Sequence, residues 1–288
     1  MDFKDTRFVV ITRGRVGQLH VLKYMPERIQ KMFTIVCHKG EKHDHLKEWE
    51  GKVSDVCEYE GNNIAEARKW CIEHFEEKFC FFFDDGCVFA VRGVKPCFGD
   101  MLKCGLTKMT TEQFTVERLE QMYLEMFNMV ISKIRTDEYG IVGVSYRTGN
   151  NRVEEDYKEN TRLGGVWAIN RDLYYKLGFD KEHAPIVKED FYLLLRFLTQ
   201  GYKTCSVYKF CLDKKGGVNM KGGCSIYRTQ EVINKCSEDF QKLFPQFVKL
   251  RDISYKKSWK GCETGTTYDV TVYWKKAYQY GLMKRNKK

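Results

Sequence analysis

F-C-F-F-F-D-D-G, the stretch from residue 79 to residue 86, decides the fold of this chain. Its run of phenylalanines around a single cysteine predicts a short strand that is strongly buried. Asp84 and Asp85 end the strand, and Gly86 permits a turn directly behind them. The pattern therefore predicts two adjacent carboxylates at the end of a buried strand.

The sequence before this stretch alternates between strand and helix patterns. Short apolar runs predict strands at residues 7–12, 32–37 and 54–59, and apolar residues at helical spacing predict a helix over residues 63–75. This alternation is typical of an α/β fold with a mostly parallel central sheet and helices on both faces. In such a sheet, ligands bind outside the carboxyl ends of the strands. Polar residues follow three of the predicted strands, at Arg13-Gly14-Arg15, Cys37-His38-Lys39 and Asp84-Asp85-Gly86.

The rest of the chain continues the pattern into one predicted domain over residues 1–250. The further elements that we expect are strands at residues 140–146, 164–170 and 205–212 and helices at residues 115–135, 171–177, 191–198 and 231–244. Residues 150–162 are polar and without pattern, so we expect a mobile loop there. Residues 251–288 form a basic C-terminal extension that we expect to pack on the domain, with a disordered tail at residues 284–288.

The composition favours a reduced, cytoplasmic protein. The 12 cysteines form no C-x-x-C pair, so we expect buried free thiols and no structural zinc site. His38, His43 and His45 lie in a polar stretch and are expected to be solvated, without a role as metal ligands. The sequence contains no apolar run of about 18 residues and begins with charged residues, so we expect no membrane segment and no signal peptide.

A formal net charge of +10 suits a polyanionic partner, because lysines and arginines release counterions from phosphates. DNA or another anionic surface is one interpretation of this charge. The alternative is a basic excess that only keeps the protein soluble. The oligomeric state does not follow from the sequence.

Two acidic pairs are candidates for chemistry. Asp84 and Asp85 repel each other, so they favour a cation, and Mg²⁺ or Mn²⁺ would bind there together with phosphate oxygens. The alternative is an ordinary Asp-Gly turn. Glu189 and Asp190 open the helix predicted at residues 191–198, where they either deprotonate a hydroxyl group or only favour the helix start.

Two glycine-containing segments are candidates for binding phosphate. Residues 213–228 carry Gly216-Gly217 and Gly222-Gly223 among basic residues, and paired glycines let a backbone approach a ligand closely. The alternative is a flexible hairpin, and the spacing differs from the phosphate loop of nucleoside triphosphatases. The turn at residues 61–63 leads into a helix whose N-terminus favours an anion, with Arg68 about one turn in. The alternative is an ordinary capped helix without a ligand.

The order of these motifs resembles that of GT-A glycosyltransferases. The shared pieces are a nucleotide loop at residues 12–15, a Gly/Asn turn and arginine at residues 61–68, the Asp84-Asp85 pair, a Gly-Gly-strand-Arg segment at residues 164–171 and the Glu189-Asp190 pair. A narrower resemblance, to the TET-associated glycosyltransferases of phages, adds G-G-C-S-I-Y-R at residues 222–228 and Phe244-Pro245 after the next helix.

The resemblance implies a role for each matching residue. The implied donor-binding residues are Arg13, Arg15, Arg68, Asp84, Gly164, Gly165, Gly222 and Gly223. Asp85 would approach a divalent metal, Mn²⁺ or Mg²⁺, and Asp190 would be the catalytic base with Glu189 beside it. Gly86 stands where many family members have a third acidic residue or an asparagine, and no histidine follows His183. The metal site therefore departs from the family pattern.

The resemblance also implies the reaction. A nucleotide sugar, with a UDP-sugar expected, would give its sugar to the hydroxyl of 5-hydroxymethylcytosine or another hydroxymethylpyrimidine in phage DNA, with inversion at the sugar. The target base would have to leave the duplex stack to reach the site. Three alternatives stay open: a glycosyltransferase for a surface polysaccharide, lipid or protein; a nucleotidyltransferase; and a DNA-binding protein without activity.

Overall fold

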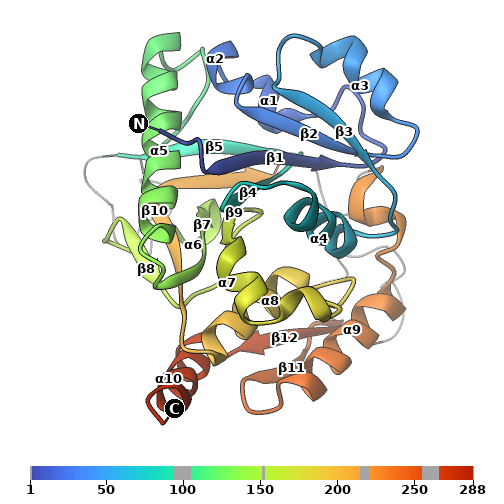
Figure 1. Ribbon diagram of the computed structural model, residues 1–288, viewed down its shortest axis with the longest axis vertical. Helices are drawn as coiled ribbons and strands as arrows, with labels where there is room; N and C mark the ends of the chain where they lie inside the picture. Colours follow the sequence, from blue (N-terminus) through green and yellow to red (C-terminus); the bar gives the residue numbers. More distant parts are fainter. Residues whose placement is uncertain (1, 94–104, 151–152, 215–220, 255–265, 288) are drawn as a thin grey trace.

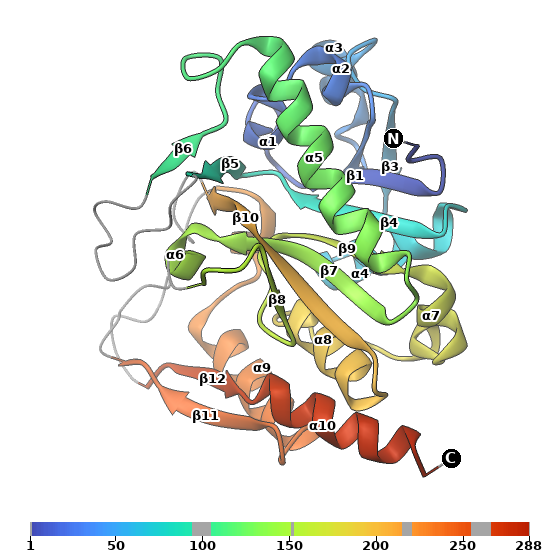
Figure 2. The same ribbon diagram turned by 90° about the vertical axis from the view of Figure 1, so that its left-hand side faces the viewer.

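A ten-stranded sheet crosses the middle of the molecule, with helices above and below it (Figures 1 and 2). The computed structural model describes residues 2–93, 105–150, 153–214, 221–254 and 266–287. In the order of their hydrogen bonding, the strands are β3 (Asp55–Tyr59), β2 (Phe33–His38), β1 (Thr6–Thr12), β4 (Phe79–Asp84), β9 (Val166–Asn170), β7 (Tyr139–Tyr146), β10 (Lys203–Lys214), β5 (Cys87–Arg92) and β6 (Leu106–Lys108). A short strand, β8 (Tyr157–Glu159), pairs with the first half of β10.

Most strands of this sheet run in one direction. β3, β2, β1 and β4 are parallel neighbours, and β7 is parallel to β10. β9 lies antiparallel between β4 and β7, so β4, β7 and β10 all point the same way. The carboxyl ends of β1 and β4 consequently meet at one edge of the sheet. The α/β fold with a mostly parallel sheet, as the sequence predicts, is confirmed.

Alternating side chains of the central strands build two separate cores. In β1, Phe8 and Val10 face one core, and Val9 and Ile11 face the other. The helices of the first core are α1 (His20–Lys23), α2 (Glu27–Gln30), α3 (Lys42–Trp49) and α5 (Val116–Ile134). Those of the second are α4 (Ile64–His74), α7 (Arg171–Lys176) and α8 (Glu189–Thr199). Helices therefore cover both faces of the sheet, as predicted.

The run F-C-F-F-F is apolar throughout because both of its faces are covered. Phe81 and Phe83 of β4 pack into the first core, and Phe82 packs into the second. Phe127 of α5 lies over the first core with its ring centroid 5.8 Å from those of Phe81 and Phe83. Trp167 of β9 meets Phe82 on the other face, at 4.9 Å between ring centroids. The strand that carries the acidic pair is thus held between two aromatic layers.

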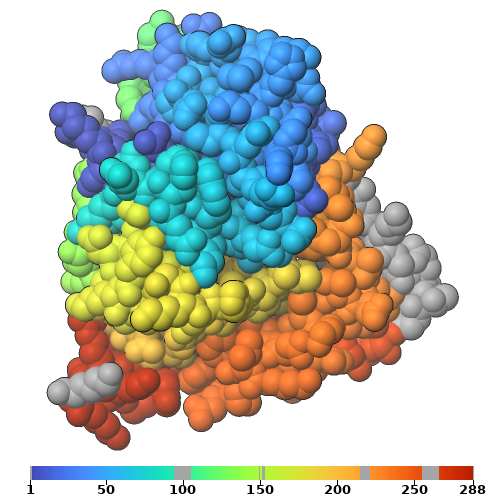
Figure 3. Space-filling model, turned by 45° about the vertical axis from the view of Figure 1, so that its right-hand side comes forward, coloured from blue at the N-terminus to red at the C-terminus, as the bar shows by residue number. Residues whose placement is uncertain are grey.

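A further layer covers the outer side of α8. It consists of α9 (Gln230–Leu243), the two-stranded antiparallel sheet β11 (Val248–Asp252) and β12 (Tyr268–Val272), and α10 (Trp274–Arg285), which lie together at the bottom of Figures 1 and 2. Phe240, Val248, Val270 and Ala277 share one apolar cluster with α8. In the space-filling view, orange atoms extend upward from this layer along one side of the molecule to the blue N-terminal third (Figure 3). They belong to the segment before α9, where Gly222 lies against Gly14. The division of the chain at residue 250 stays a prediction.

Three sequence-based expectations are wrong. Residues 150–162 contain β8, which pairs with β10 although its three residues are too few to show a strand pattern. His45 is fully buried in α3 instead of solvated, and burial lowers its pKa. The helix α10 extends through Lys284 and Arg285, which we expected to be disordered. Arg285 is held there because its guanidinium lies 4.8 Å over the Tyr202 ring.

The cysteines behave as the sequence predicts. The described part of the chain holds nine of them, all free, and seven are buried.

Within the same part, the remaining short helices are α6 (Arg147–Asn150) and the 3₁₀ helices η1 (Phe179–Lys181) and η2 (Gly223–Ile226). None of the helices in the described ranges combines the length and the apolar character needed to cross a membrane.

The contact between α10 and α8 depends on a glycine, and we predict that Gly281→Ala destabilises the protein. A Cβ at this position would lie 2.1 Å from the carbonyl oxygen of Leu198 and 2.5 Å from the backbone nitrogen of Gly201. Helix propensity alone would favour alanine by about 1 kcal/mol. We nevertheless expect the free energy of unfolding in urea to fall by about 1–3 kcal/mol because the helices must separate.

The matched control is Gln279→Ala, an exposed position on the same helix, which should change stability by less than about 0.5 kcal/mol. A Gly281→Ala protein as stable as the parent would show that α10 does not depend on this close packing.

Candidate active site

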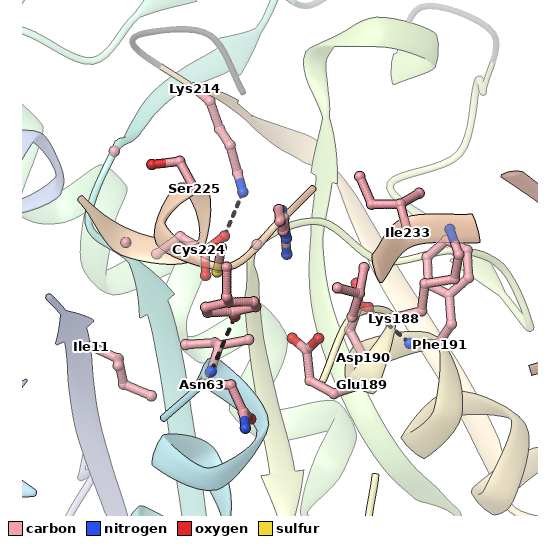
Figure 4. A pocket seen from close by; sticks show the side chains of 18 of the residues that line it. Ile11, Asn63, Lys188, Glu189, Asp190, Phe191, Lys214, Cys224, Ser225 and Ile233 are labelled. Carbon is pink, nitrogen blue, oxygen red and sulfur yellow. Dashed lines mark hydrogen bonds and ion pairs between the residues drawn. The ribbon is translucent and has the colours of Figure 1, made fainter. Parts of the chain in front are cut away.

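A cavity of about 510 Å³ lies at the carboxyl ends of β1 and β4. The starts of α4 and α8, the helix η2 and the strands β11 and β12 contribute its other walls. Figure 4 shows Ile11 and Asn63 on one side, Phe191 and Ile233 on the other, and the two acidic residues of α8 between them. The predicted site residues that line the cavity are Arg13, Arg15, Arg68, Asp84, Asp85, Gly165, Glu189, Asp190 and Gly223.

Asp84 accepts hydrogen bonds from two cations at the end of β4. Arg68 Nη2 lies 2.9 Å from its Oδ1, and Lys214 Nζ lies 2.5 Å from its Oδ2. Burial alone would raise the pKa of Asp84, but the charges of Lys214 and Arg68 outweigh it and hold this pKa below its usual value. Asp84 is therefore an anion locked between two positive charges.

Asp85 makes a separate ion pair. Arg15 Nη1 lies 2.6 Å from its Oδ1, and the hydroxyl of Thr12 donates to its Oδ2 at 3.1 Å. Burial raises the pKa of Asp85, and this effect exceeds the lowering by Arg15. Arg15 also donates to the carbonyl oxygens of Lys221 and Gly222, at 3.4 and 3.3 Å, so it connects the end of β4 with the glycine-containing segment.

Arg68 is the buried cation that connects β4 with α8. The side chain of Asn63 caps α4, and this cap fixes the helix start and places Arg68 in its second turn, only 5% exposed. Its guanidinium binds both Asp84 and Glu189 and lies 4.8 Å from the centre of the Trp167 ring. The predicted arginine after the Gly/Asn turn thus faces the interior and joins two acidic motifs.

The start of α8 presents Glu189 and Asp190 to the cavity. Lys188, just before them, has a φ of +71°, a left-handed conformation that residues other than glycine rarely adopt, and its Nζ lies 2.7 Å from Asp269 Oδ1. Glu189 is buried, and this burial raises its pKa to about 7 although Arg68 opposes the shift. No described residue donates a hydrogen bond to its buried Oε2. Asp190 is partly exposed to the cavity.

Glycines let neighbouring segments approach each other beside the cavity. Gly222 has a φ of +82°, and a Cβ there would lie 2.6 Å from the carbonyl oxygen of Gly14. A Cβ at Gly165 would lie 2.2 Å from Asp84 Oδ2, so a larger residue would displace that carboxylate. Gly164 and Gly222 are not among the lining residues. A Cβ at Gly164 would lie 2.6 Å from the carbonyl oxygen of Val144, so this glycine also serves close packing of the backbone.

Cations outnumber carboxylates around the cavity. The eight cationic residues that line it are Arg13, Arg15, Arg68, Arg162, Lys188, Lys214, Arg228 and Arg251, and the five acidic ones are Asp84, Asp85, Glu189, Asp190 and Asp269. The described lining thus has an excess of three positive charges and favours an anionic ligand. Lys215 and the pair Gly216-Gly217 of the same predicted phosphate-binding segment lie outside the described residues.

One wall of the cavity comes from the end of the chain and contains none of the predicted site residues. Arg251, Tyr268 and Asp269 belong to β11 and β12, within the segment predicted only as a basic extension. Alternation in Y-D-V-T-V at residues 268–272 would have indicated a strand. No motif connects that strand with Lys188, which is 81 residues earlier in the chain.

Comparison with known proteins places the chain in a family through a family model that matches most of its length. The model of the TET-associated glycosyltransferases matches residues 6–223, a span that includes all the predicted site residues. A relative from Enterobacteria phage T6, β-glucosyl-HMC-α-glucosyl-transferase, is 20% identical over 261 residues and is matched over 87% of this chain and 85% of its own length.

The fold of this chain is similar to that of several solved structures. A mycobacterial protein of 9% identity superimposes with a TM-score of 0.49 over 93% of this chain and 83% of its own. S. aureus TarS 1–349 in complex with UDP-GlcNAc, at 10% identity, gives a TM-score of 0.45 over 82% of this chain and 66% of its own. GalNAc-T7 with UDP, GalNAc and Mn²⁺, at 11% identity, gives a TM-score of 0.43. The match covers 73% of this chain and 43% of GalNAc-T7, so this chain spans less than half of that protein.

Because burial raises the pKa of Glu189 to about 7, we predict that this residue makes a pH-dependent contribution to the free energy of unfolding. The substitution Glu189→Gln should remove that contribution. The folded protein holds this proton at pH values where the unfolded chain has lost it, so the free energy of unfolding should fall as the pH rises from about 4.5 to 7. The difference in stability between the parent and Glu189→Gln should change by up to ~3 kcal/mol over that range, in favour of the variant at the higher pH.

Urea unfolding at several pH values measures this difference, with Glu50→Gln as an exposed control that should follow the parent throughout. Parallel pH profiles of the parent and Glu189→Gln would contradict the assigned pKa.

Proposed function

Because this chain belongs to the TET-associated glycosyltransferase family and is therefore a nucleotide-sugar-dependent glycosyltransferase, we propose that it transfers a sugar to the hydroxymethyl group of a modified pyrimidine in DNA. The donor that we propose is a uridine diphosphate sugar. The observation that carries the proposal is that Asp190 lines the same cavity as Arg13, Arg15 and Lys214. Such a transfer needs a base for the acceptor hydroxyl and counter-charges for the leaving diphosphate.

We assign the donor to the half of the cavity around Asn63 and Gly223. The amino end of α4 attracts the phosphates, since helix N-termini favour anions. Tyr59 and Tyr227 line this half and offer aromatic surface to the nucleotide base. Arg13 lies beside them, and its guanidinium is oriented by a 2.8 Å hydrogen bond to the carbonyl oxygen of residue 62.

The proposed reaction is a single displacement at the anomeric carbon. The hydroxyl oxygen of the acceptor attacks C1 of the sugar, and the bond between C1 and the diphosphate oxygen breaks. The electron pair of that bond leaves with the diphosphate, and the hydroxyl proton passes to the carboxylate of Asp190. Attack and departure on opposite faces invert the anomeric centre.

Asp190 and Glu189 take different roles in this proposal. Glu189 is buried and holds Arg68 through its Oε1, so we assign it to positioning the start of α8 and the arginine. Asp190 is partly exposed to the cavity and lies between the donor half and the side with Phe191 and Ile233 (Figure 4). This location suits a group that must meet an acceptor hydroxyl as it approaches the sugar.

DNA is the proposed acceptor on two grounds. The relative from phage T6 carries HMC, hydroxymethylcytosine, in its name, and the formal net charge of +10 suits a polyanion. A base that leaves the duplex stack would reach Asp190 from the side of Phe191 and Arg251, where an apolar ring and a cation line the cavity. The reaction would take place in the cytoplasm of an infected cell.

We predict that Asp190→Asn abolishes transfer and keeps donor binding. Loss of a general base should lower the rate of transfer by about 10²- to 10⁴-fold, while the cationic half of the cavity is unchanged. Mass spectrometry of nucleosides measures transfer, and calorimetry measures donor binding. Asp172→Asn, an exposed carboxylate on α7, is the matched control and should retain parental activity. Full activity of Asp190→Asn would refute the assigned base.

The acceptor is tested with a panel of nucleotide sugars and three substrates: DNA containing 5-hydroxymethylcytosine, the same DNA with cytosine, and a surface polysaccharide. We expect a new glycosylated nucleoside only in the hydroxymethylated DNA, and binding to that DNA that weakens steeply with salt. Transfer to the polysaccharide instead would assign the enzyme to another substrate class.

A further inference from the structure

We infer that Lys214 and Arg15 supply the counter-charge for the leaving diphosphate, in the position where the fold family uses a divalent metal. This inference rests on the proposed function for its reaction and concerns the donor half of the site. Nothing in the order of motifs indicates it, because the acidic pair by itself predicts a metal. In the folded protein, however, these carboxylates already have other partners.

All four oxygens of the acidic pair are occupied by side chains. Arg68 and Lys214 bind the two oxygens of Asp84, and Arg15 and Thr12 bind those of Asp85. Three of these four partners are cations. Carboxylate oxygens that already accept charged hydrogen bonds at 2.5–2.9 Å are poor ligands for a further cation.

The predicted metal ligand would have to release its arginine. A divalent ion at Asp85 would displace the guanidinium of Arg15, which is bound 2.6 Å away and is itself largely buried, with 17% of its side chain exposed. The displaced guanidinium would stay close to the ion, because its other hydrogen bonds go to the carbonyl oxygens of Lys221 and Gly222. Two like charges at that distance oppose metal binding.

The surrounding residues also lack the ligands to complete a metal shell. Gly86 follows the acidic pair and has no side chain to offer. Glu189 is held by Arg68. Among the residues that the structure describes, no three histidines, cysteines or acidic residues gather closely enough to hold a metal ion. These residues therefore do not fit Mg²⁺ or Mn²⁺, and the proposed reaction uses neither ion.

Lys214 is built into the site at the point where a cation is required. It ends β10 and belongs to the segment at residues 213–228 that is predicted to bind phosphate. Its side chain extends into the cavity (Figure 4), where its Nζ binds Asp84. Asp84 is the main reason that the pKa of Lys214 is raised, so the lysine stays charged at any physiological pH. An ammonium has three donors, and one of them binds Asp84. The others can bind phosphate oxygens.

Arg15 has the same capacity on the other side of the acidic pair. A guanidinium has five N–H donors, and its bonds to Asp85, Lys221 and Gly222 leave two for a ligand. Both residues line the cavity beside Gly223, where the backbone can approach the diphosphate closely. The cations are fixed by their carboxylate partners before the donor arrives, which is the arrangement that stabilises a developing negative charge.

Binding of nucleoside diphosphates tests the inference without sugar transfer. Calorimetry with UDP, GDP, ADP and CDP is run in EDTA and again with MnCl₂ or MgCl₂. We expect at least one nucleotide to bind in EDTA with a dissociation constant within about threefold of the value with metal. Binding that requires metal, or no binding in either condition, would overturn the inference. The result is independent of the acceptor, so a failure to modify DNA would leave it intact.

Substitutions identify the residues responsible. Lys214→Ala and Arg15→Ala should each weaken binding of the preferred nucleotide at least tenfold, in EDTA and in metal alike. The matched control is Lys209→Ala, a lysine of the same strand that pairs with Glu125 away from the cavity, and it should bind as the parent does. Unfolding in urea separates loss of binding from loss of fold. Parental affinity in Lys214→Ala and Arg15→Ala would also overturn the inference.

Discussion

The buried guanidinium of Arg68, bound to Asp84 and Glu189, is the interaction on which the site depends. A buried charge that loses one partner costs about 3–5 kcal/mol, so α4, the end of β4 and the start of α8 must meet. These segments come from distant parts of the chain, since Arg68 and Glu189 are 121 residues apart. The ring of Trp167, which belongs to the second core, lies 4.8 Å from the guanidinium and adds a cation–π contact.

The same constraint determines the character of the cavity. Once Asp84 is neutralised by Arg68 and Lys214, and Asp85 by Arg15, the further cations give the lining its excess of positive charge. Lys188 adds local strain, because its left-handed backbone turns the chain just before the two acidic residues of α8. Its ion pair with Asp269 lets the C-terminal strands support that turn. The site is therefore assembled by charge pairs that reach across the whole chain.

The sequence predicts the parts of this arrangement that local patterns encode. Buried strands such as 79–83, and amphipathic helices such as 115–135, have periods that reveal them. β8 has only three residues, Tyr157–Glu159, too few to show a period, and its existence depends on pairing with β10. Asp84 and Arg68 are noticed because each belongs to a short motif. The pairing of Lys214 with Asp84 joins residues 130 positions apart, and the burial of His45 depends on tertiary packing. Local sequence patterns predict neither this ion pair nor this burial.

The most direct test of this account is a crystal structure of the protein with the nucleoside diphosphate of its donor. The account predicts the nucleotide in the cavity at the ends of β1 and β4, with phosphate oxygens on Arg15 and Lys214 and with Asp190 facing the open side of the diphosphate. Arg68 should still bind both Asp84 and Glu189. A nucleotide bound elsewhere on the protein, with this cavity empty, would contradict the account.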